Sequence, residues 1–310
     1  MHLRGIGYAF VASLMFGLGA VLAQLLGKEI DATVAAILAL VGGGILLACI
    51  LVFSGSPLLK VVRFFKWRQW LDLFLLSCPG TALPLLLIVA GFARTSALEG
   101  GFLLQVNGVA ALIFAVILLK ERIRIRQGIG ILLLLLGGVL VVFKGTQGID
   151  WSSGGLGDVL LLVGAIGLGF GFVPAKRLTL HIEPLPLTAL RLLLGACTLV
   201  PILIIQLLVG RHVPQWQPSL TTLWVVLPVY ILTNFCLGYL VQQAGLVLLK
   251  AWEMAAVMQT VPLFSTIFAL LLLHASMTLL QAVGGSLAIL GGIIVSLNKA
   301  MQVTDSHLKP

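Results

Sequence analysis

Long apolar runs separated by short polar breaks restrict the fold of this chain more than any other feature of its sequence. A helix needs about 20 apolar residues to cross the hydrocarbon core of a bilayer. Only 9% of the 310 residues are charged, whereas about 25% are charged in a soluble domain. We therefore expect an all-α polytopic membrane protein. The ten predicted transmembrane helices lie at 5–26, 32–53, 70–92, 96–119, 126–143, 155–174, 185–208, 221–245, 251–273 and 278–297.

The basic residues are distributed unevenly over the predicted loops. If the N-terminus is cytoplasmic, 14 of the 19 Lys and Arg residues fall on the cytoplasmic side and four on the other side. Because Lys and Arg concentrate in cytoplasmic loops, this split predicts that both termini are cytoplasmic. It also explains the net charge of +9 by orientation in the membrane. The expected partners are the lipid bilayer and a small-molecule solute, and no nucleic acid is expected. The expected oligomeric state is a monomer or homodimer.

The second half of the chain repeats the first. A shift of 154 residues superimposes Glu99 on Glu253 and Gln105 on Gln259. Each half holds five predicted helices, and because five is odd the second copy enters the membrane from the opposite face. Inverted repeats of this kind are common in secondary transporters, with a substrate site near the midplane. The predicted units are a first five-helix repeat at 1–144, an external linker at 145–154, a second five-helix repeat at 155–299 and a cytoplasmic tail at 300–310.

The most characteristic stretch runs from Ser96 to Val142, where the sequence LLKER ends at Arg122 and a glycine pair at 137–138 follows; the second repeat contains Pro262. On these motifs nearly the whole chain resembles the drug/metabolite transporter superfamily, specifically its EamA-type branch of paired five-helix repeats. The resemblance implies transport of small metabolites, often amino acids or related solutes and commonly by efflux. It also implies a cavity lined by the first, third and fourth helices of each half.

Two positions depart from the pattern of that family. Gly108, next to Asn107, stands where the first repeat usually has a proline. Ala275 stands where the second repeat would have an acid that matches Glu121. Gly108 and Pro262 are interpreted as hinges, with a static kink as the alternative for the proline. No substrate signature transfers from the family to this chain.

The paired acids Glu99 and Glu253 are candidates for proton coupling, because an ionisable group inside a span is rare without a partner or a wet cavity. Glu253 is also a candidate for binding a cationic or zwitterionic solute. Structural roles remain open for both acids. Ser96 and Glu99 have the spacing of a helix capping box, and Lys250 lies three residues before Glu253.

Other polar residues fall deep inside predicted spans, where they either contact the solute or form hydrogen bonds between helices. Arg191 is the one basic residue well within a span; it reaches the cytoplasmic surface, pairs with an acid or recognises an anionic solute. Tyr239 either lines a cavity or anchors its helix at the membrane interface. The substrate-binding candidates are Gln105, Asn107, Asn234, Tyr239, Glu253 and Gln259.

The predicted function is secondary active transport of a small metabolite, an amino acid or related solute, by alternating access and in the direction of efflux. The alternatives are a membrane-embedded enzyme or assembly factor and, within transport, a sugar-phosphate, nucleotide-sugar or organic-cation carrier. The five histidines are scattered over tails and loops, so we expect no catalytic residues, metal or cofactor. The four cysteines are interpreted as core residues. In a bacterium the expected location is the plasma (inner) membrane.

Overall fold

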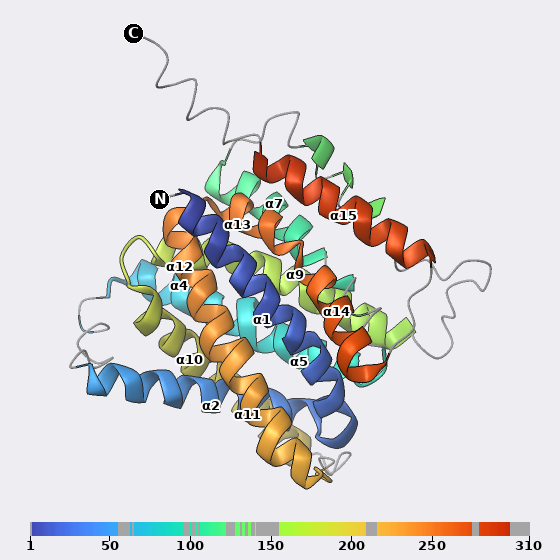
Figure 1. Cartoon of the computed structure of the whole chain (residues 1–310). Helices are drawn as coiled ribbons and strands as arrows, with labels where there is room; N and C mark the ends of the chain where they lie inside the picture. Colours follow the sequence, from blue (N-terminus) through green and yellow to red (C-terminus); the bar gives the residue numbers. More distant parts are fainter. Residues whose placement is uncertain are drawn as a thin grey trace.

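The computed structural model is a bundle of helices that pack along one another (Figure 1). The described part of the chain contains no strand, only one isolated bridge between Ile30 and Trp216. The structure describes residues 2–54, 63, 65–95, 100, 103–104, 106–121, 128–130, 132–133, 136–137, 140, 155–208, 216–274 and 279–297.

The helices of the two halves are named as in Figure 1. The described helices of the first half are α1 (His2–Glu29), α2 (Ala32–Phe53), α4 (Trp67–Ser77), the π-helix η1 (Cys78–Ala82), α5 (Leu83–Phe92) and α7 (Val106–Leu119). Those of the second half are α9 (Gly155–Leu178), α10 (Pro184–Leu208), η2 (Thr222–Val226), α11 (Leu227–Tyr230), η3 (Ile231–Gly238), α12 (Tyr239–Leu248), α13 (Ala251–Met258), α14 (Val261–Leu273) and α15 (Leu279–Leu297).

Seven helical segments of the described residues are long and apolar enough to cross a membrane, and α7 is a shorter apolar helix. The chain is therefore a multi-pass integral membrane protein. The predicted helix at 32–53 coincides with α2, whereas α1 extends beyond the predicted 5–26 at both ends. The predicted helix at 126–143 lies mostly outside the described residues. The count of ten helices and the cytoplasmic position of both termini stay predictions.

Three predicted helices change conformation midway. The segment 70–92 contains the π-helix η1 between α4 and α5. The segment 221–245 contains the π-helices η2 and η3, and the segment 251–273 is divided between α13 and α14. The division has a local cause at Pro262. A proline has no N–H to donate and its ring clashes with the carbonyl four residues earlier. That carbonyl belongs to Met258, the last residue of α13, and Pro262 lies in the first turn of α14.

Equivalent helices of the two halves make equivalent contacts with the other half. Helix α1 packs against α12 and α14 of the second half, and α9 packs against α5 and α7 of the first. Lys120 and His274, which are 154 positions apart in the sequence, follow the last residues of α7 and α14 and have φ angles of 54° and 49°. They are the only described non-glycine residues with positive φ. The shift that superimposes the two sequences thus also superimposes a helix ending.

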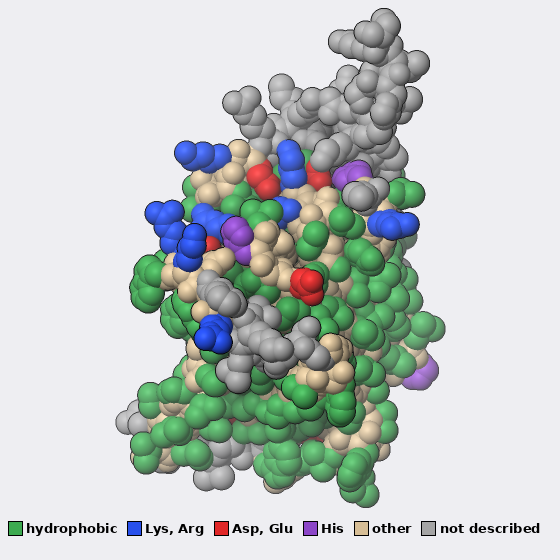
Figure 2. All heavy atoms as spheres, turned by 90° about the vertical axis from the view of Figure 1, so that its left-hand side faces the viewer, with side chains coloured by type: hydrophobic (Ala, Val, Ile, Leu, Met, Phe, Trp, Pro, Cys, Tyr) green, Lys and Arg blue, Asp and Glu red, His purple; other side chains and the backbone are tan. Residues whose placement is uncertain are grey.

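Lys and Arg side chains gather toward one part of the face in Figure 2, above a surface that is mainly hydrophobic. Helix α4, the start of α13 and the ends of α7 and α9 meet there, as the contacts described below show. We call this end of the bundle the basic end; it carries Lys66, Lys120, Lys176, Arg177 and Lys250. A hydrophobic belt beside a basic end is the surface expected of a protein that sits in a bilayer.

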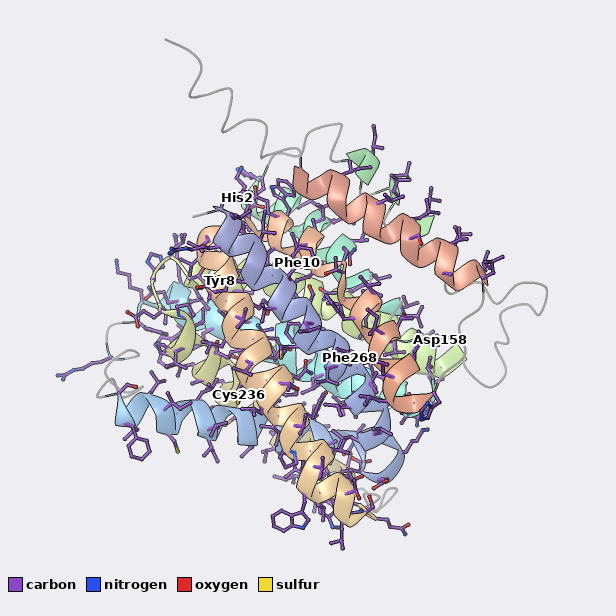
Figure 3. All side chains as sticks on the ribbon, in the orientation of Figure 1. His2, Tyr8, Phe10, Asp158, Cys236 and Phe268 are labelled. Carbon is purple, nitrogen blue, oxygen red and sulfur yellow. The ribbon has the colours of Figure 1, made fainter. Side chains whose placement is uncertain are left out.

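The interpretation of the cysteines as core residues is correct for Cys236 and wrong for two others. Cys236 on η3 is buried, with its Sγ 3.8 Å from the carbonyl oxygen of Gly43 on α2 (Figure 3). Cys49 and Cys197 are exposed on α2 and α10. In a membrane protein an apolar run has a lipid-facing side as well as a buried side, so apolar surroundings in sequence do not place a residue in the core.

Candidate functional site

A cavity lies among helices of both halves. The space free of protein atoms, its opening to solvent included, is about 900 Å³. Most of its lining is apolar, with aromatic rings from α1, α5, α9 and η3. The first, third and fourth helices of each half contribute, as the family resemblance implies, and α10 adds one residue. The polar and charged side chains in the lining are Asn107, Arg191, Tyr230, Asn234, Tyr239, Gln242 and Gln259.

The cavity brings together several of the candidates from the sequence. Asn107, Asn234, Tyr239 and Gln259 line it, as do the hinge candidates Gly108 and Pro262. Pro262 falls at the midpoint of the Ala251–Leu273 span. These residues therefore meet well inside the bundle, although they lie far apart in the chain. Glu99 and Gln105 lie outside the described residues.

Gln259 reaches the cavity from the break between α13 and α14, and its side chain lies against Gly108 of α7. A Cβ built on Gly108 would lie 2.5 Å from both Oε1 and Nε2 of Gln259. Real Cβ atoms do not come this close to other heavy atoms, so the Gln259 amide occupies space that only glycine leaves free at position 108. The absence of the family proline at Gly108 thus has a local consequence in the cavity.

Asn234 is positioned in the same way from the opposite side. It lies on the π-helix η3, and a Cβ on Gly19 of α1 would come within 2.5 Å of its Cγ. The Oδ1 atoms of Asn234 and of Asn107 are buried and have no hydrogen-bond partner among the described residues. Buried carbonyl oxygens are nearly always paired in native structures. These two acceptors in the cavity lining are therefore available to a hydrogen-bond donor on a bound solute.

Arg191 on α10 is buried, with 3% of its surface exposed, and lines the cavity. Its Nε donates to Thr81 Oγ1 over 2.6 Å, and Thr81 belongs to the π-helix η1. The guanidinium carbon lies 4.0 Å from the centroid of the Tyr239 ring, a cation–π contact. Of the three roles open to Arg191 from the sequence, exit to the membrane surface is therefore excluded. The list of substrate-binding candidates from the sequence contains neither Arg191 nor Gln242. For Arg191 a signal exists in the sequence, because a lone basic residue inside a span is unusual, and recognition of an anionic solute is one of the roles left open for it.

Glu253 lies outside this cavity lining. It is 7% exposed in the first turn of α13, where its Oε2 accepts a hydrogen bond of 3.1 Å from the backbone N–H of Lys250. The alternative from the sequence was that Lys250 neutralises Glu253; the observed hydrogen bond comes from the backbone N–H of Lys250. A role for Glu253 in substrate binding or proton coupling stays a prediction.

Contacts at the basic end tie the two halves together. Glu121, just after α7, accepts hydrogen bonds of 3.3 and 3.2 Å from the backbone N–H groups of Ala251 and Trp252. These N–H groups belong to the first turn of α13, which has no carbonyl partners within its own helix. Carboxylates at such helix starts are also favoured by the helix dipole. Glu121 of the first half therefore caps a helix of the second half.

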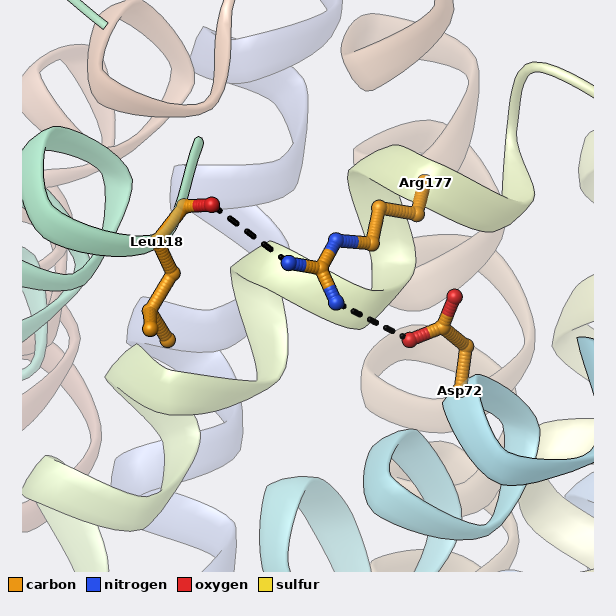
Figure 4. A network of polar contacts seen from close by, with 3 residues as sticks. All are labelled: Asp72, Leu118 and Arg177. Atoms are coloured by element: carbon orange, nitrogen blue, oxygen red, sulfur yellow. Dashed lines mark hydrogen bonds and ion pairs between the residues drawn. The ribbon is translucent and has the colours of Figure 1, made fainter. Parts of the chain in front are cut away.

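Two basic residues at the end of α9 extend this set of contacts. Lys176 Nζ donates to the carbonyl oxygens of Leu246 and Leu249, over 2.5 and 2.7 Å. Arg177 forms an ion pair of 3.3 Å with Asp72 of α4 and also donates to the carbonyl oxygen of Leu118 over 3.4 Å. Figure 4 shows Arg177 lying between these two partners. Helix α4 and the ends of α7, α9 and α12 are thus joined at the basic end.

The apolar helices span a membrane, and helices of both halves of the chain line a cavity among them. This arrangement defines a membrane protein of transporter architecture. The sequence matches the model of the EamA-like transporter family over residues 3–143 and 155–297. The chain belongs to this family. The family in turn is consistent with the drug/metabolite transporter superfamily that the sequence motifs resemble.

Relatives with curated descriptions agree with this assignment. The chain is 26% identical over 245 residues to an uncharacterized transporter of Archaeoglobus fulgidus, covering 76% of this chain and 82% of that protein. It is 24% identical over 211 residues to the uncharacterized transporter YyaM of Bacillus subtilis, covering 68% of each. It is 23% identical over 264 residues to a chloroplast WAT1-related protein of Arabidopsis thaliana, covering 83% of this chain and 61% of that protein.

A solved structure shows the same fold. A crystal structure described only as that of a protein aligns with 94% of this chain and 96% of its own length, with a TM-score of 0.75. The sequence identity is 16%, so the likeness concerns the fold alone.

Proposed function

We propose that this protein is a secondary active transporter that exports a small metabolite, an amino acid or related solute, by alternating access. The observation that carries the proposal is the cavity, because both halves of the chain line it and hydrogen-bonding side chains face it amid apolar residues. A site between two halves can be exposed to either side of the membrane when one half moves against the other. Membership of a family of transporters supports the same function.

The contacts at the basic end serve, in this proposal, as the closed gate of one side. Lys176 and Glu121 join α9 and α7 to the α12–α13 turn. Movement of one half against the other has to break these hydrogen bonds. With both termini in the cytoplasm, as the distribution of Lys and Arg predicts, this gate is the cytoplasmic one.

Transport should be tested with the purified full-length protein in liposomes. Liposomes loaded with an unlabelled amino acid are diluted into the same radiolabelled amino acid, and label accumulates transiently inside if the protein exchanges it. A panel of amino acids and related metabolites covers the proposed solutes, and protein-free liposomes give the background. Failure to move any solute in this panel, together with detection of a chemical conversion, would replace the transporter by the alternative of a membrane-embedded enzyme.

A further inference from the structure

We propose that the cavity selects a singly charged organic anion, a carboxylate on an apolar body, and that Arg191 is the residue that binds the carboxylate. This proposal rests on the proposed transport function and narrows its solute to a carboxylate that is related to amino acids but has no ammonium group, because the described lining offers no carboxylate to an ammonium.

Arg191 is a buried cation whose partners are all uncharged. Its hydrogen bonds go to the Thr81 hydroxyl, the Gln242 amide and the Gly80 carbonyl oxygen, and its charged group stacks on Tyr239. Among the described residues no carboxylate forms an ion pair with it. A charge held in a membrane interior without a counter-charge is costly. An anionic group on the solute would supply the missing charge.

The end of the guanidinium that binds carboxylates is the end with the weakest protein contacts. Nε makes a short bond of 2.6 Å, but Nη1 is 3.3 Å from Gln242 Oε1 and Nη2 is 3.4 Å from the Gly80 oxygen. Good N–H···O bonds measure about 2.7–3.2 Å. The two Nη groups together form the fork that pairs with a carboxylate. The bond to Thr81 and the Tyr239 ring therefore fix the side chain, and its fork retains capacity for a ligand.

The charge of the lining restricts the solute to one negative charge. Arg191 is the only charged side chain among the described residues that line the cavity. A monoanion neutralises it, whereas a phosphate dianion would leave an unpaired charge in apolar surroundings. An organic cation would meet a like charge and find no carboxylate in the described lining. The cavity thus disfavours sugar phosphates, nucleotide sugars and organic cations.

The remainder of the lining fits an apolar body. Phe16, Phe92, Leu168, Phe172 and Phe235 face the cavity from four different elements. Burial of apolar surface contributes about 25 cal/mol per Å², so these side chains favour a solute with a hydrocarbon or aromatic part. Polar carboxylates without such a part gain little from this surface.

Phenyl compounds that differ only in their head group test the charge requirement. Purified full-length protein in detergent is titrated with phenylacetate, phenylacetamide, phenethylamine and phenyl phosphate, and binding is measured by calorimetry and by the shift of the unfolding temperature. We expect phenylacetate to bind most tightly and to stabilise the protein, since a ligand of the folded state raises stability. Equal binding of phenylacetamide, or no binding of phenylacetate and of the aliphatic carboxylate hexanoate, would overturn the proposal.

Two variants test Arg191 by opposite means. Arg191→Gln removes the charge, and we expect phenylacetate to bind about 10- to 100-fold more weakly, as the loss of a charged hydrogen bond implies. Gln242→Glu keeps Arg191 but places a carboxylate beside Nη1, so that an internal anion competes with the ligand. It should weaken phenylacetate to a similar extent without lowering the folded yield. This variant keeps the proposal testable if Arg191→Gln fails to fold.

Gln206→Glu, on the same helix α10 but outside the described lining, is the matched control, since it adds the same charge elsewhere and should leave phenylacetate binding unchanged. Wild-type affinity for phenylacetate in Gln242→Glu would contradict the role of Arg191. The two proposals fail separately: transport of a neutral or cationic solute would overturn the anion selectivity alone, whereas binding of phenylacetate without transport of any solute would overturn the transport function alone.

Discussion

Gly19 of α1 and Asn234 of η3 fit together so closely that the side chain of Asn234 occupies the space where a Cβ on residue 19 would lie. Two helices of different halves therefore approach each other at a wall of the cavity. The contact needs a glycine on one helix and a side-chain amide on the other. It links helix packing directly to the position of a cavity residue.

We expect Gly19→Ala to displace Asn234 and to weaken solute binding about tenfold, at a cost of about 1–3 kcal/mol in stability, as is usual for overpacking. Binding of the solute found in the transport screen and the unfolding temperature measure the two effects. Gly7→Ala in the same helix is the control, because a Cβ there would meet no atom within 4 Å. Equal behaviour of both variants would show that Asn234 tolerates movement.

Gln259→Ala is expected to weaken solute binding without lowering the folded yield, because the amide lies in the cavity lining beside Gly108. Equilibrium binding and the yield of folded protein in size-exclusion chromatography check this expectation. Binding that stays intact would instead assign Gln259 to helix packing.

Replacement of Lys176 by Met should favour opening of the basic end, because it removes two hydrogen bonds to the α12–α13 turn. In a cysteine-free background, Ala255→Cys in the cavity lining reports this opening through its rate of labelling by a maleimide added from the basic side. We expect labelling several-fold faster than with Lys176 present. Lys28→Met, at the end of α1, provides the control. An unchanged rate in Lys176→Met would show that this lysine does not hold the gate.

Proton coupling makes a prediction for Glu253. If its carboxyl group carries the coupling proton, solute flux driven by a pH gradient in proteoliposomes should fall strongly in Glu253→Gln, which cannot release a proton. The hydrogen bond from the Lys250 N–H can still be accepted by the amide oxygen, so the helix start is preserved. Unchanged flux with unchanged pH dependence would exclude Glu253 from the coupling step.

Local sequence patterns predict much of the architecture, because apolar runs identify the membrane spans and matched polar residues identify the repeat. The start of α9 at Gly155 and both ends of α2 follow from those runs. The π-helical segment around Thr81 does not, since its conformation depends on neighbouring helices. The hydrogen bond from Arg191 to Thr81 joins residues 110 positions apart.

The candidate residues illustrate the same limit. Asn234 and Gln259 are candidates because polar side chains inside apolar spans are unusual, and both line the cavity. Glu253 is expected near the start of the helix at 251–273, and its carboxylate does lie at a helix start, where it accepts a backbone hydrogen bond. The position of a polar residue within a predicted transmembrane helix therefore indicates that its side chain needs a partner. The partner itself is determined by packing between helices.

The cap that Glu121 places on α13 has a consequence for the balance between the two conformations of the proposed transport cycle. At the repeat-equivalent position the chain has Ala275, whose side chain has no hydrogen-bond acceptor. A helix cap of this kind contributes about 0.5–2 kcal/mol, which changes an equilibrium ratio by about 2- to 30-fold. A transporter made of two copied halves would then populate its two conformations unequally. Its apparent affinity for solute would differ between the two faces of the membrane even with an identical binding site.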